Sequence, residues 1–429
     1  MKFPRRQFLK TMGAAAALGR GWKAAAVSAS NFSTKKAGNI SMTAAKTYDV
    51  AVIGAGVFGA WTAYYLRKSG ATVALLDAYG PSNARASSGG ESRIIRMGYG
   101  PGEIYTRWSM RALPLWKQLF ADAGQPQLFH ETGMLWMYHE QEEYALDTLA
   151  MLQKCGARFD RLSLADLRAR YPQISFEDNV WGLLEPQSGV LMARRAVQTV
   201  VSRALKNGVD YRQEAVLAPE APGGQSRAAS FKTTSGETIS AGTFVFACGP
   251  WLPKVFPGIL GGRIFPSRQE VFFFGGPAGD TRFEMPQMPT WINLQDEYYG
   301  MPDIESRGFK IACDRHGEAV DPDTQSRIAS TEGAAAAKQY LARRFPALKD
   351  APLVETRVCQ YENTSNGDFL IDKHPALENV WLVGGGSGHG FKHGPSLGEY
   401  VAARITQGGT IEPRFSLATK QPLQQRAVF

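Results

Sequence analysis

Residues 48–77 constrain the fold of this chain more than any other stretch, because they hold all parts of a dinucleotide-binding unit in order. The apolar run at 49–53 has no polar alternation and predicts a buried parallel strand. The sequence G-A-G-V-F-G follows at 54–59, and a helix over 57–67 and a strand over 72–76 complete the unit. We therefore predict a Rossmann-like domain that begins near residue 47.

Four residues of this unit have separate physical tasks. Gly54 makes the tight turn, Gly56 lets the backbone approach a pyrophosphate, and Gly59 lets the helix pack closely on the strand. Asp77 ends the second strand, where its carboxylate can accept a hydrogen bond from a ribose hydroxyl. A glycine-rich turn without a ligand would not need this complete order, but the unit alone does not distinguish FAD from NAD.

Residues 1–29 predict a twin-arginine export signal rather than part of the fold. Arg5 and Arg6 precede a short, weakly apolar run at 11–19, and small residues at 27–29 offer a cleavage site. Because the twin-arginine export machinery carries folded proteins, it suits an enzyme that receives its cofactor before export. We expect a bacterial protein that is periplasmic or secreted, and the alternative is an uncleaved, flexible N-terminus.

The net charge of +9 comes mostly from this leader, whose six basic residues and absence of acidic ones leave +3 for the remaining 400 residues. No basic stripe interleaved with aromatic residues follows, so we expect no nucleic-acid partner. No apolar run reaches 18 residues, so we expect no membrane span. The length predicts two domains.

The four cysteines lack the spacing of metal ligands and of a disulfide framework. This predicts free thiols and no metal site at Cys155, Cys248, Cys313 and Cys359.

The middle of the chain predicts a change from helices to strands. Apolar residues at helical spacing predict helices over 103–124 and 140–170. Short strand patterns separated by turns predict a three-stranded excursion over 209–247. The aromatic, strand-forming segment 263–315 predicts a sheet that forms one wall of a pocket, and 331–344 predicts an amphipathic helix without a chemical role.

The C-terminal part repeats the order of strand, glycine loop and helix. A strand at 380–383 runs into the loop 384–392, and 395–404 predicts a helix. A chain that returns to its nucleotide domain more than 300 residues later fits an extended cofactor, and therefore FAD better than a nicotinamide. The fold class that we predict is α/β, or α+β for the whole chain.

The chain also resembles the monomeric sarcosine oxidase and N-methyltryptophan oxidase family of D-amino-acid-oxidase-like flavoproteins. The likeness covers nearly all of the chain after the leader. It rests on the opening fingerprint and on Ser92-Arg93-Ile94-Ile95-Arg96, Tyr299-Gly300-Met301-Pro302, Gly308-Phe309-Lys310, Cys359-Gln360-Tyr361 and Ser387-Gly388-His389-Gly390-Phe391-Lys392. The resemblance implies a Rossmann-like FAD-binding domain, which we assign to 47–128, 187–250 and 360–415, and an interleaved mixed-sheet substrate domain at 129–186 and 251–359.

The resemblance implies FAD that is bonded through the sulfur of Cys359 to the 8-methyl carbon of the flavin. An inert core thiol is the alternative for this cysteine. The cofactor-binding residues that it implies, with the fingerprint, are Gly54, Gly56, Gly59, Asp77, Ser92, Arg93, Cys359, Gly388, His389, Gly390 and Lys392.

The resemblance also implies roles for four basic residues. Arg96 and Lys392 match residues that bind the substrate carboxylate, a task that suits the planar fork of arginine. Arg93 matches a residue close to the flavin. If the segment were helical, Arg93 and Arg96 would lie on one face of the helix. The alternative for both arginines is an ion pair at the protein surface. Lys310 matches the lysine that activates dioxygen, where a fixed ammonium stabilises developing superoxide. A solvated strand lysine is the alternative for Lys310.

Four further residues complete the expected site. Tyr299 and Tyr361 match pocket walls, although either is also compatible with ordinary core packing. Asp314 departs from the sarcosine-oxidising members, which carry histidine there, and resembles the acid of fructosyl amino acid oxidases. An acid at this position would bind a cationic group or sugar hydroxyls, and a loop aspartate is the alternative. Gly89 stands where the sarcosine oxidases carry a histidine near the flavin.

The function implied is that of an FAD-dependent oxidase of a secondary amino acid, which forms an imine and reduces dioxygen to hydrogen peroxide. The substrate would be a small amine that bears a carboxylate, and we expect a monomer. The alternatives are an amine dehydrogenase with another electron acceptor, a fructosyl amino acid oxidase and a hydroxy-acid oxidase of the same fold. A non-catalytic flavin-bearing assembly or redox-sensing protein is the alternative of a different class.

Overall fold

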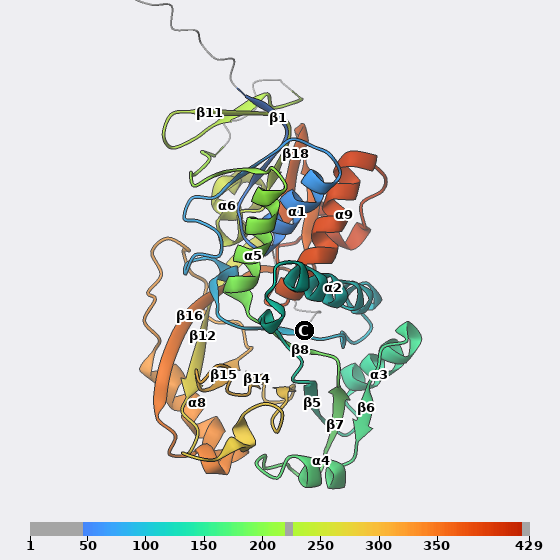
Figure 1. Cartoon of the computed structure of the whole chain (residues 1–429), viewed down its shortest axis with the longest axis vertical. Helices are drawn as coiled ribbons and strands as arrows, with labels where there is room; N and C mark the ends of the chain where they lie inside the picture. The colour runs from blue at the N-terminus through green and yellow to red at the C-terminus, as the bar shows by residue number, and fades with distance from the viewer. Residues whose placement is uncertain (1–45, 219–225, 423–429) are drawn as a thin grey trace, which may run out of the picture. The chain divides into compact units, whose positions relative to one another are not determined.

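The computed structural model describes residues 46–218 and 226–422 of the 429-residue chain (Figure 1). The predicted export signal at 1–29 lies outside the described residues. Within the described ranges, no helix is both long enough and apolar enough to cross a membrane.

The first sheet is built on the predicted dinucleotide-binding unit. Its strands follow the order β17, β18, β11, β1, β2, β9, with β10 paired to β11, and the four inner neighbours from β18 to β2 run parallel. The bounds are β1 Thr47–Ile53, β2 Val73–Leu76, β9 Asp210–Arg212, β10 Ser230–Lys232, β11 Thr238–Phe246, β17 Leu370–His374 and β18 Leu377–Gly384. The predicted strands at 49–53, 72–76 and 380–383 are thus confirmed to within three residues at each end.

The three-stranded excursion predicted over 209–247 is wrong in its pairing. β10 and β11 are antiparallel neighbours, but β9 pairs in parallel with β2 and forms the edge of the first sheet. The helix α5, Ala193–Lys206, brings the chain back across the sheet before β9, so β9 enters in the parallel direction.

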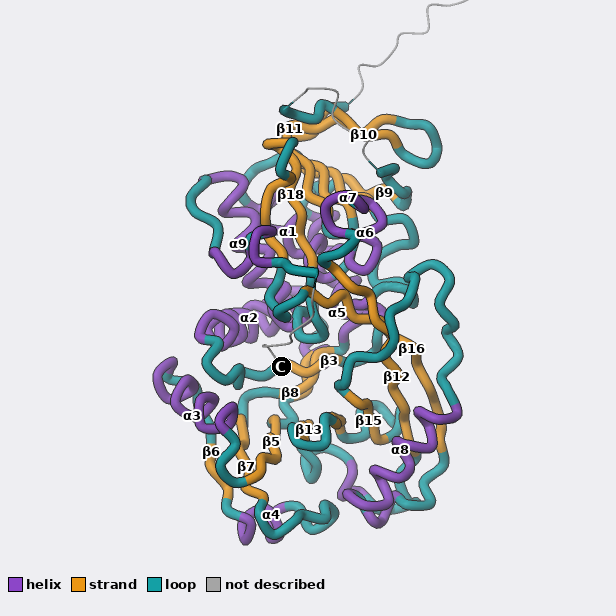
Figure 2. The backbone as a smooth tube through the Cα atoms, turned by 180° about the vertical axis from the view of Figure 1, so that it is seen from behind, coloured by secondary structure: helices purple, strands orange, loops and turns teal. Residues whose placement is uncertain are grey.

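The absence of polar alternation in β1 has a direct structural cause. Val50 and Val52 lie in the core beneath the helices, whereas Ala51 and Ile53 lie in a second core on the other face of the sheet. Both faces are therefore buried, as in a parallel sheet covered on two sides. On one face, α1 Val57–Lys68 contacts both α5 and α9 Gly394–Gln407. On the other face, α6 Leu252–Val255 and α7 Pro257–Leu260 supply residues to the core (Figure 2).

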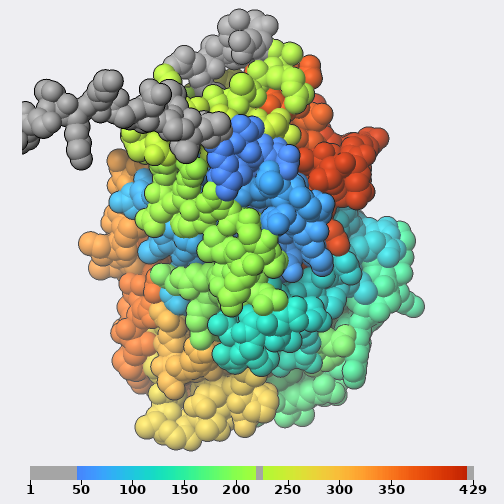
Figure 3. Space-filling view, turned by 45° about the horizontal axis from the view of Figure 1, so that its top comes forward, coloured from blue at the N-terminus to red at the C-terminus, as the bar shows by residue number. Residues whose placement is uncertain are grey.

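Segments far apart in the sequence meet on the helical face. Figure 3 shows the blue atoms of β1 and α1 between the green atoms of α5 and the red atoms of the C-terminal part. The helix predicted over 395–404 is confirmed as α9, and α1 packs against it over its length. The return of the chain to its first domain is thus a feature of the fold.

The second sheet holds eight strands in the order β16, β12, β15, β14, β13, β5, β7, β6. It is mixed, because β13 and β5 run parallel and the other neighbours run antiparallel. The helix predicted over 331–344 is confirmed as α8, Thr331–Arg344, and shares a core with this sheet. The bounds are β5 Met134–His139, β6 Asp160–Leu162, β7 Val180–Glu185, β12 Ile264–Phe274, β13 Thr290–Asn293, β14 Tyr298–Met301, β15 Phe309–Cys313 and β16 Leu353–Thr364.

The helical prediction over 140–170 missed a strand within this range. The chain forms α3 Glu143–Cys155, then β6, then α4 Leu164–Arg170. Gly156 ends α3 in the left-handed conformation, and Ser163 starts α4 with a capping box to Asp166. These two caps separate the helices, whose apolar spacing alone looked continuous.

A small third sheet carries Arg93, and Arg96 follows directly after its strand. Arg93 lies in the strand β3, Arg93–Ile95, which pairs with β8 Gly189–Leu191, and β8 also pairs with β4 Phe129–His130. The helical spacing proposed for Arg93 and Arg96 is therefore wrong, because β-branched Ile94 and Ile95 form an extended segment. The predicted helix over 103–124 is confirmed as α2, Glu103–Asp122.

The fold class predicted from the sequence is confirmed. The residue ranges assigned to the two domains remain a prediction, although the two large sheets draw on alternating parts of the chain as that assignment supposes.

Candidate functional site

Both ends of the described chain line one cavity of about 580 Å³ at the carboxyl ends of β1, β2 and β11. This is where open parallel sheets bind their ligands. Of the residues predicted to bind the cofactor, those that line it are Gly54, Gly56, Asp77, Arg93, Gly388 and Gly390.

The three fingerprint glycines are required for three different reasons. Gly54 has φ +106°, and a Cβ there would lie 2.3 Å from the carbonyl oxygen of Ala247. A Cβ on Gly59 would lie 1.8 Å from the carbonyl oxygen of Gly54, so Gly59 serves the packing of α1 and does not line the cavity. At Gly56 a Cβ would meet only Ser88 Oγ, at 3.5 Å, and would otherwise project into space that a ligand can use.

Asp77 lies at the cavity and is held by the turn beside it. Its carboxylate accepts hydrogen bonds from the backbone N–H groups of Ala55, at 2.7 Å, and Tyr79, at 2.9 Å. Burial nevertheless raises the pKa of this carboxyl above its ordinary value.

Glu362 is a buried carboxyl at the same cavity that the sequence did not single out. Its Oε1 accepts a hydrogen bond from the backbone N–H of Gly386 at 3.3 Å, whereas its Oε2 has no hydrogen-bond partner among the described residues. Burial raises the pKa of Glu362 to about 7. The sequence feature that could have identified Glu362 is its position as an acidic residue in the otherwise weakly charged segment after Cys359.

A second, narrower cavity of about 80 Å³ adjoins the first and shares Arg93, Tyr361 and Gly388 with it. It brings together every residue predicted to be catalytic. These are Arg93, Arg96, Tyr299, Lys310, Asp314, Tyr361 and Lys392, and the predicted cofactor residue His389 also lines this cavity.

Arg96 enters this cavity from the segment just after β3 and is only 5% exposed. Its guanidinium lies 4.2 Å from the ring centre of Tyr99 and 4.7 Å from that of Trp136, and it donates a hydrogen bond to the carbonyl of Gly98. The aromatic rings fix the plane of the fork by cation–π contact.

Glu185 holds the segment that carries Arg96, and sequence reasoning missed it. Its carboxylate accepts from the backbone N–H groups of Met97, at 2.6 Å, and Gly98, at 2.9 Å, and from Nε1 of Trp136 at 2.8 Å. The sequence signal was an acid at the end of the apolar strand 180–185. A buried carboxylate with this many donors positions the backbone next to it.

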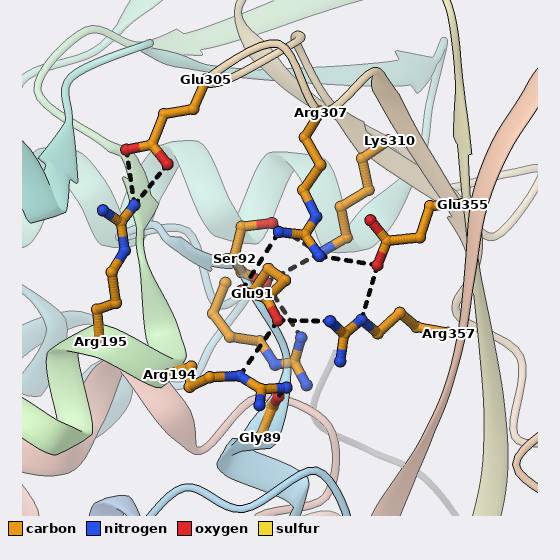
Figure 4. Close-up of polar contacts among 11 residues, drawn as sticks. Gly89, Glu91, Ser92, Arg194, Arg195, Glu305, Arg307, Lys310, Glu355 and Arg357 are labelled. Atoms are coloured by element: carbon orange, nitrogen blue, oxygen red, sulfur yellow. Dashed lines mark hydrogen bonds and ion pairs between the residues drawn. The ribbon is translucent and has the colours of Figure 1, made fainter. Parts of the chain in front are cut away.

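Lys310 reaches the cavity from β15 and is 2% exposed. Nζ donates hydrogen bonds to the carbonyl oxygen of Ser92 at 2.9 Å and to its Oγ at 3.1 Å (Figure 4). Burial lowers the pKa of Lys310 well below its ordinary value, and Arg93 lowers it further. Ser92, which was predicted to bind the cofactor, lines neither the large nor the narrow cavity and instead holds the side-chain nitrogen of Lys310.

The turn that contains Ser92 is held by an ion-pair cluster. Figure 4 shows Glu91 among Arg194, Arg307 and Arg357, with N–O distances of 3.2, 3.5 and 2.7 Å. Glu355 also pairs with Arg307 and Arg357, at 2.8 Å each. The cluster fixes the backbone that presents its oxygen to Lys310.

Cys359 lies on β16 beside Arg93, whose Nη2 is 3.0 Å from the sulfur. Both residues, with Lys310, line a small cavity of about 20 Å³. Gly89 lines it as well, and a Cβ there would lie 2.0 Å from the carbonyl oxygen of Asn83. The backbone therefore excludes any side chain at Gly89, which accounts for the glycine at that position.

Asp314 and Tyr361 face each other across the narrow cavity. Oη of Tyr361 donates a hydrogen bond to Oδ1 of Asp314 at 3.1 Å. Tyr299 lies close by, and burial raises its pKa to about 12. The cavity thus presents cationic groups and the carboxylate of Asp314 between aromatic walls, and Glu297 also belongs to its lining.

A comparison with known sequences identifies the family. The chain matches the FAD dependent oxidoreductase (DAO) family over residues 49–404. It belongs to this family. The cofactor of the chain is therefore FAD, as the resemblance of the motifs implied.

Similar proteins agree with the family over most of the chain. Peroxisomal sarcosine oxidase of Mus musculus is 31% identical over 365 residues, which are 82% of this chain and 91% of that protein. N-methyl-L-tryptophan oxidase of Salmonella heidelberg (strain SL476) is 30% identical over 383 residues, 86% of this chain and 97% of that protein. The solved structure of L-proline dehydrogenase from P. horikoshii has a TM-score of 0.76 at 20% identity and covers 87% of this chain and 97% of its own. The D-amino-acid-oxidase-like fold predicted from the sequence is confirmed.

The residues at the large cavity fit the FAD of this family. Gly56 leaves the backbone and the N-terminus of α1 open to a pyrophosphate, and the carboxylate of Asp77 is placed near a ribose. The unpartnered Oε2 of Glu362 is the kind of buried polar atom that a ligand hydroxyl satisfies.

Glu362 makes a pH-dependent contribution to stability whose sign follows from its pKa. The folded state holds the proton up to about pH 7, whereas the unfolded chain releases it near the ordinary pKa of a glutamate, 4.5. Stability is therefore lost as pH rises from about 4.5 to 7, and the loss stays constant above. Glu362→Gln should raise the free energy of unfolding by up to about 3 kcal/mol at pH 8 and change little at pH 4.5.

Thermal or urea unfolding of the purified protein at the two pH values checks this expectation. The exposed Glu318 provides a control, since Glu318→Gln should leave the difference between the two pH values unchanged. A Glu362→Gln protein that gains nothing at pH 8 would show that the carboxyl is ionised and satisfied in the folded protein.

Proposed function

We propose that this chain is an FAD-dependent oxidase of a secondary amino acid, which converts the C–N bond to an imine and dioxygen to hydrogen peroxide. The observation that carries the proposal is that Arg96, Lys310 and Lys392 line one narrow cavity that is continuous with the FAD cavity. Family relatives named for sarcosine and N-methyl-L-tryptophan support the substrate class.

The substrate's carboxylate binds between Arg96 and Lys392. The guanidinium of Arg96 has its plane fixed by Tyr99 and Trp136 and offers parallel donors to a carboxylate. Lys392 supplies a further N–H donor from the glycine loop. Fixing the carboxylate in this way orients the C–N bond, and orientation is a large part of what an enzyme contributes to such a reaction.

FAD, when bound, supplies the two-electron acceptor for the amine. Lys310 places a buried N–H cation where dioxygen acquires negative charge, and Ser92 keeps that group in place. Tyr299 and Tyr361 exclude water from the walls of the narrow cavity. Hydrolysis of the imine needs no residue of the site.

Asp314 favours a substrate larger than N-methylglycine. Its carboxylate lines the narrow cavity and accepts a hydrogen bond from the hydroxyl of Tyr361, so it lies where a second polar group of the substrate can reach it. A fructosyl amino acid is the second candidate on this ground.

Peroxide formation from a panel of amines tests the proposal. The panel holds N-methyl amino acids, pipecolate, fructosyl amino acids and 2-hydroxy acids, and peroxide is measured in air beside anaerobic bleaching of the flavin. Bleaching without peroxide would instead establish a dehydrogenase. The absence of bleaching with every compound would leave the non-catalytic flavoprotein as the better interpretation.

A covalent bond between Cys359 and FAD is part of the proposal. The position of the sulfur supports it, because Cys359 lines a small cavity with Lys310 and its sulfur is 3.0 Å from the guanidinium of Arg93, a residue that also lines the FAD cavity. Acid precipitation should leave the yellow colour in the pellet, whereas Cys359→Ala should release it completely into the supernatant. Cys313→Ala is the matched control and should retain the colour. Release of all colour from the unaltered protein would contradict the covalent bond.

We also infer twin-arginine export and a periplasmic or secreted location from Arg5 and Arg6 and the run that follows them. Fractionation of cells that make the full chain, with both arginines intact or replaced by lysine, checks this location. We propose that the enzyme acts as a monomer, and light scattering of the purified protein measures its mass.

A further inference from the structure

Behind the narrow cavity, Lys392, Tyr99 and His393 form a buried chain of hydrogen bonds. Nζ of Lys392 donates to Oη of Tyr99 at 2.7 Å, and that oxygen lies 2.8 Å from Nε2 of His393. The three residues are 4%, 2% and 0% exposed. A proton can therefore pass between the amine and the imidazole through one hydroxyl without movement of the backbone.

The neighbouring His389 offers the hydroxyl of Tyr99 a second and more distant acceptor than His393. Its Nε2 lies 2.8 Å from the carbonyl oxygen of Gly367, which only accepts, so Nε2 carries the proton. Neutral His389 then turns an acceptor nitrogen, Nδ1, toward Oη of Tyr99 at 3.4 Å. Nδ1 of His393 is buried and has no hydrogen-bond partner in the described part of the chain.

The charges around the chain limit it to one extra proton. Burial lowers the pKa of Lys392 well below its ordinary value, and Arg96 lowers it further. Burial likewise lowers the pKa of His393, as does Lys392 itself. The ionisable groups that act on the pair from the surrounding elements are Arg96, Glu185, Asp314 and His389. Two bases that oppose each other's charge behave as one shared proton site.

We propose that Lys392 takes the proton that the substrate's ammonium group must lose before oxidation, and that Tyr99 and His393 relay it away from the substrate. The inference rests on the proposed function, because a secondary amine is a cation in water and gives up hydride only when it is neutral.

The transfer changes no oxidation state. An N–H bond of the substrate breaks and leaves its electron pair on the amine nitrogen, while an N–H bond forms on neutral Nζ of Lys392. Tyr99 then accepts a proton from Nζ as its own hydroxyl proton passes to Nε2 of His393. The imidazolium that results carries protons on both nitrogens, and its Nδ1–H has no acceptor among the described residues.

Binding of methoxyacetate to the holoenzyme tests the first half of the proposal. Methoxyacetate carries the carboxylate of N-methylglycine but has an ether oxygen in place of the amine, so it brings no proton. Calorimetry at pH 8 in phosphate and in Tris buffer should show uptake of about one proton per site, because a carboxylate beside neutral Lys392 favours the ammonium form. Binding without proton uptake would overturn the proposal.

Two substitutions of His393 test the relay. His393→Gln keeps a hydrogen-bonding group beside Tyr99 but accepts no proton, whereas His393→Phe removes both properties. Both substitutions should lower kcat/KM about 10²-fold. They should also move the acid limb of the pH profile of kcat/KM to lower pH, because Lys392 then no longer shares its proton with His393. Tyr99→Phe should act in the same direction. A His393→Gln enzyme with the pH profile of the unaltered protein would show a merely structural hydrogen bond and overturn the relay.

His139→Gln is the matched control, because His139 lies at the end of β5 outside the three cavities, and it should leave the profile unchanged. Failure of the proposed function is a separate result, since it appears as the absence of amine oxidation in the unaltered enzyme. Proton uptake with methoxyacetate is measured without turnover, so it reports on Lys392 in either case.

Discussion

Lys310→Met is expected to slow the reaction of the substrate-reduced enzyme with dioxygen by about 10²–10³-fold, while anaerobic reduction by the amine keeps its rate. The ammonium of Lys310 is held by two oxygens of Ser92 and lies in a buried site, where a fixed cation stabilises a developing anion strongly. Stopped-flow spectroscopy of the flavin measures the two half-reactions separately.

The pH dependence of reoxidation provides a second readout for Lys310. Only the protonated amine is a cation, and burial holds its pKa well below the ordinary value of 10.5. Reoxidation of the unaltered enzyme should therefore slow as pH rises, at a lower pH than an ordinary lysine would give, and the Lys310→Met rate should lose this dependence. Lys349→Met, at an exposed lysine, is the control. Equal losses in both half-reactions would mean that Lys310 serves substrate binding instead.

The nucleotide half of the site was predictable because its constraints are local. Gly54 and Gly59 are fixed by contacts within the strand, turn and helix, and a sequence of about thirty residues contains all of them. β1 could be predicted for the same reason, since burial on both faces removes polar alternation.

The residues that we propose as catalytic were identified from short motifs shared with the family, and not from the number of residues between them. Arg96, Lys310 and Lys392 come from three distant segments, and only the fold brings them to one cavity. The one geometric argument made from spacing, that Arg93 and Arg96 share a helical face, failed because the segment is a strand.

The residues that support the site could not be predicted from the sequence. Glu185, Tyr99 and His393 act through contacts that join segments about 90 to 290 positions apart. An isolated buried acid or histidine has no local pattern, because its partners are backbone groups or side chains of other elements. The end of α3 and the start of α4 within 140–170 could, however, have been predicted from the local sequence. Gly156 and Ser163 are residue types that typically end and begin helices.

Arg96→Met is expected to weaken carboxylate binding by about 10²-fold, because it removes a charged, two-pronged donor from a buried site. The dissociation constant of methoxyacetate, followed by the absorption change of the flavin, measures this loss without turnover. Arg96→Lys should recover only part of the affinity, since Tyr99 and Trp136 fix the plane of a guanidinium and lysine has no planar fork.

The comparison of the two Arg96 variants separates charge from geometry. If charge alone mattered, Arg96→Lys would bind methoxyacetate as well as the unaltered enzyme, and the role of the two aromatic rings would be refuted. Arg111→Met removes an exposed arginine that pairs with Glu399 on α9 and should change neither binding nor turnover. We propose Lys392 as the second carboxylate ligand. A variant that lacks both Arg96 and Lys392 should therefore lose less than the product of the single losses, as expected for groups that bind one carboxylate together.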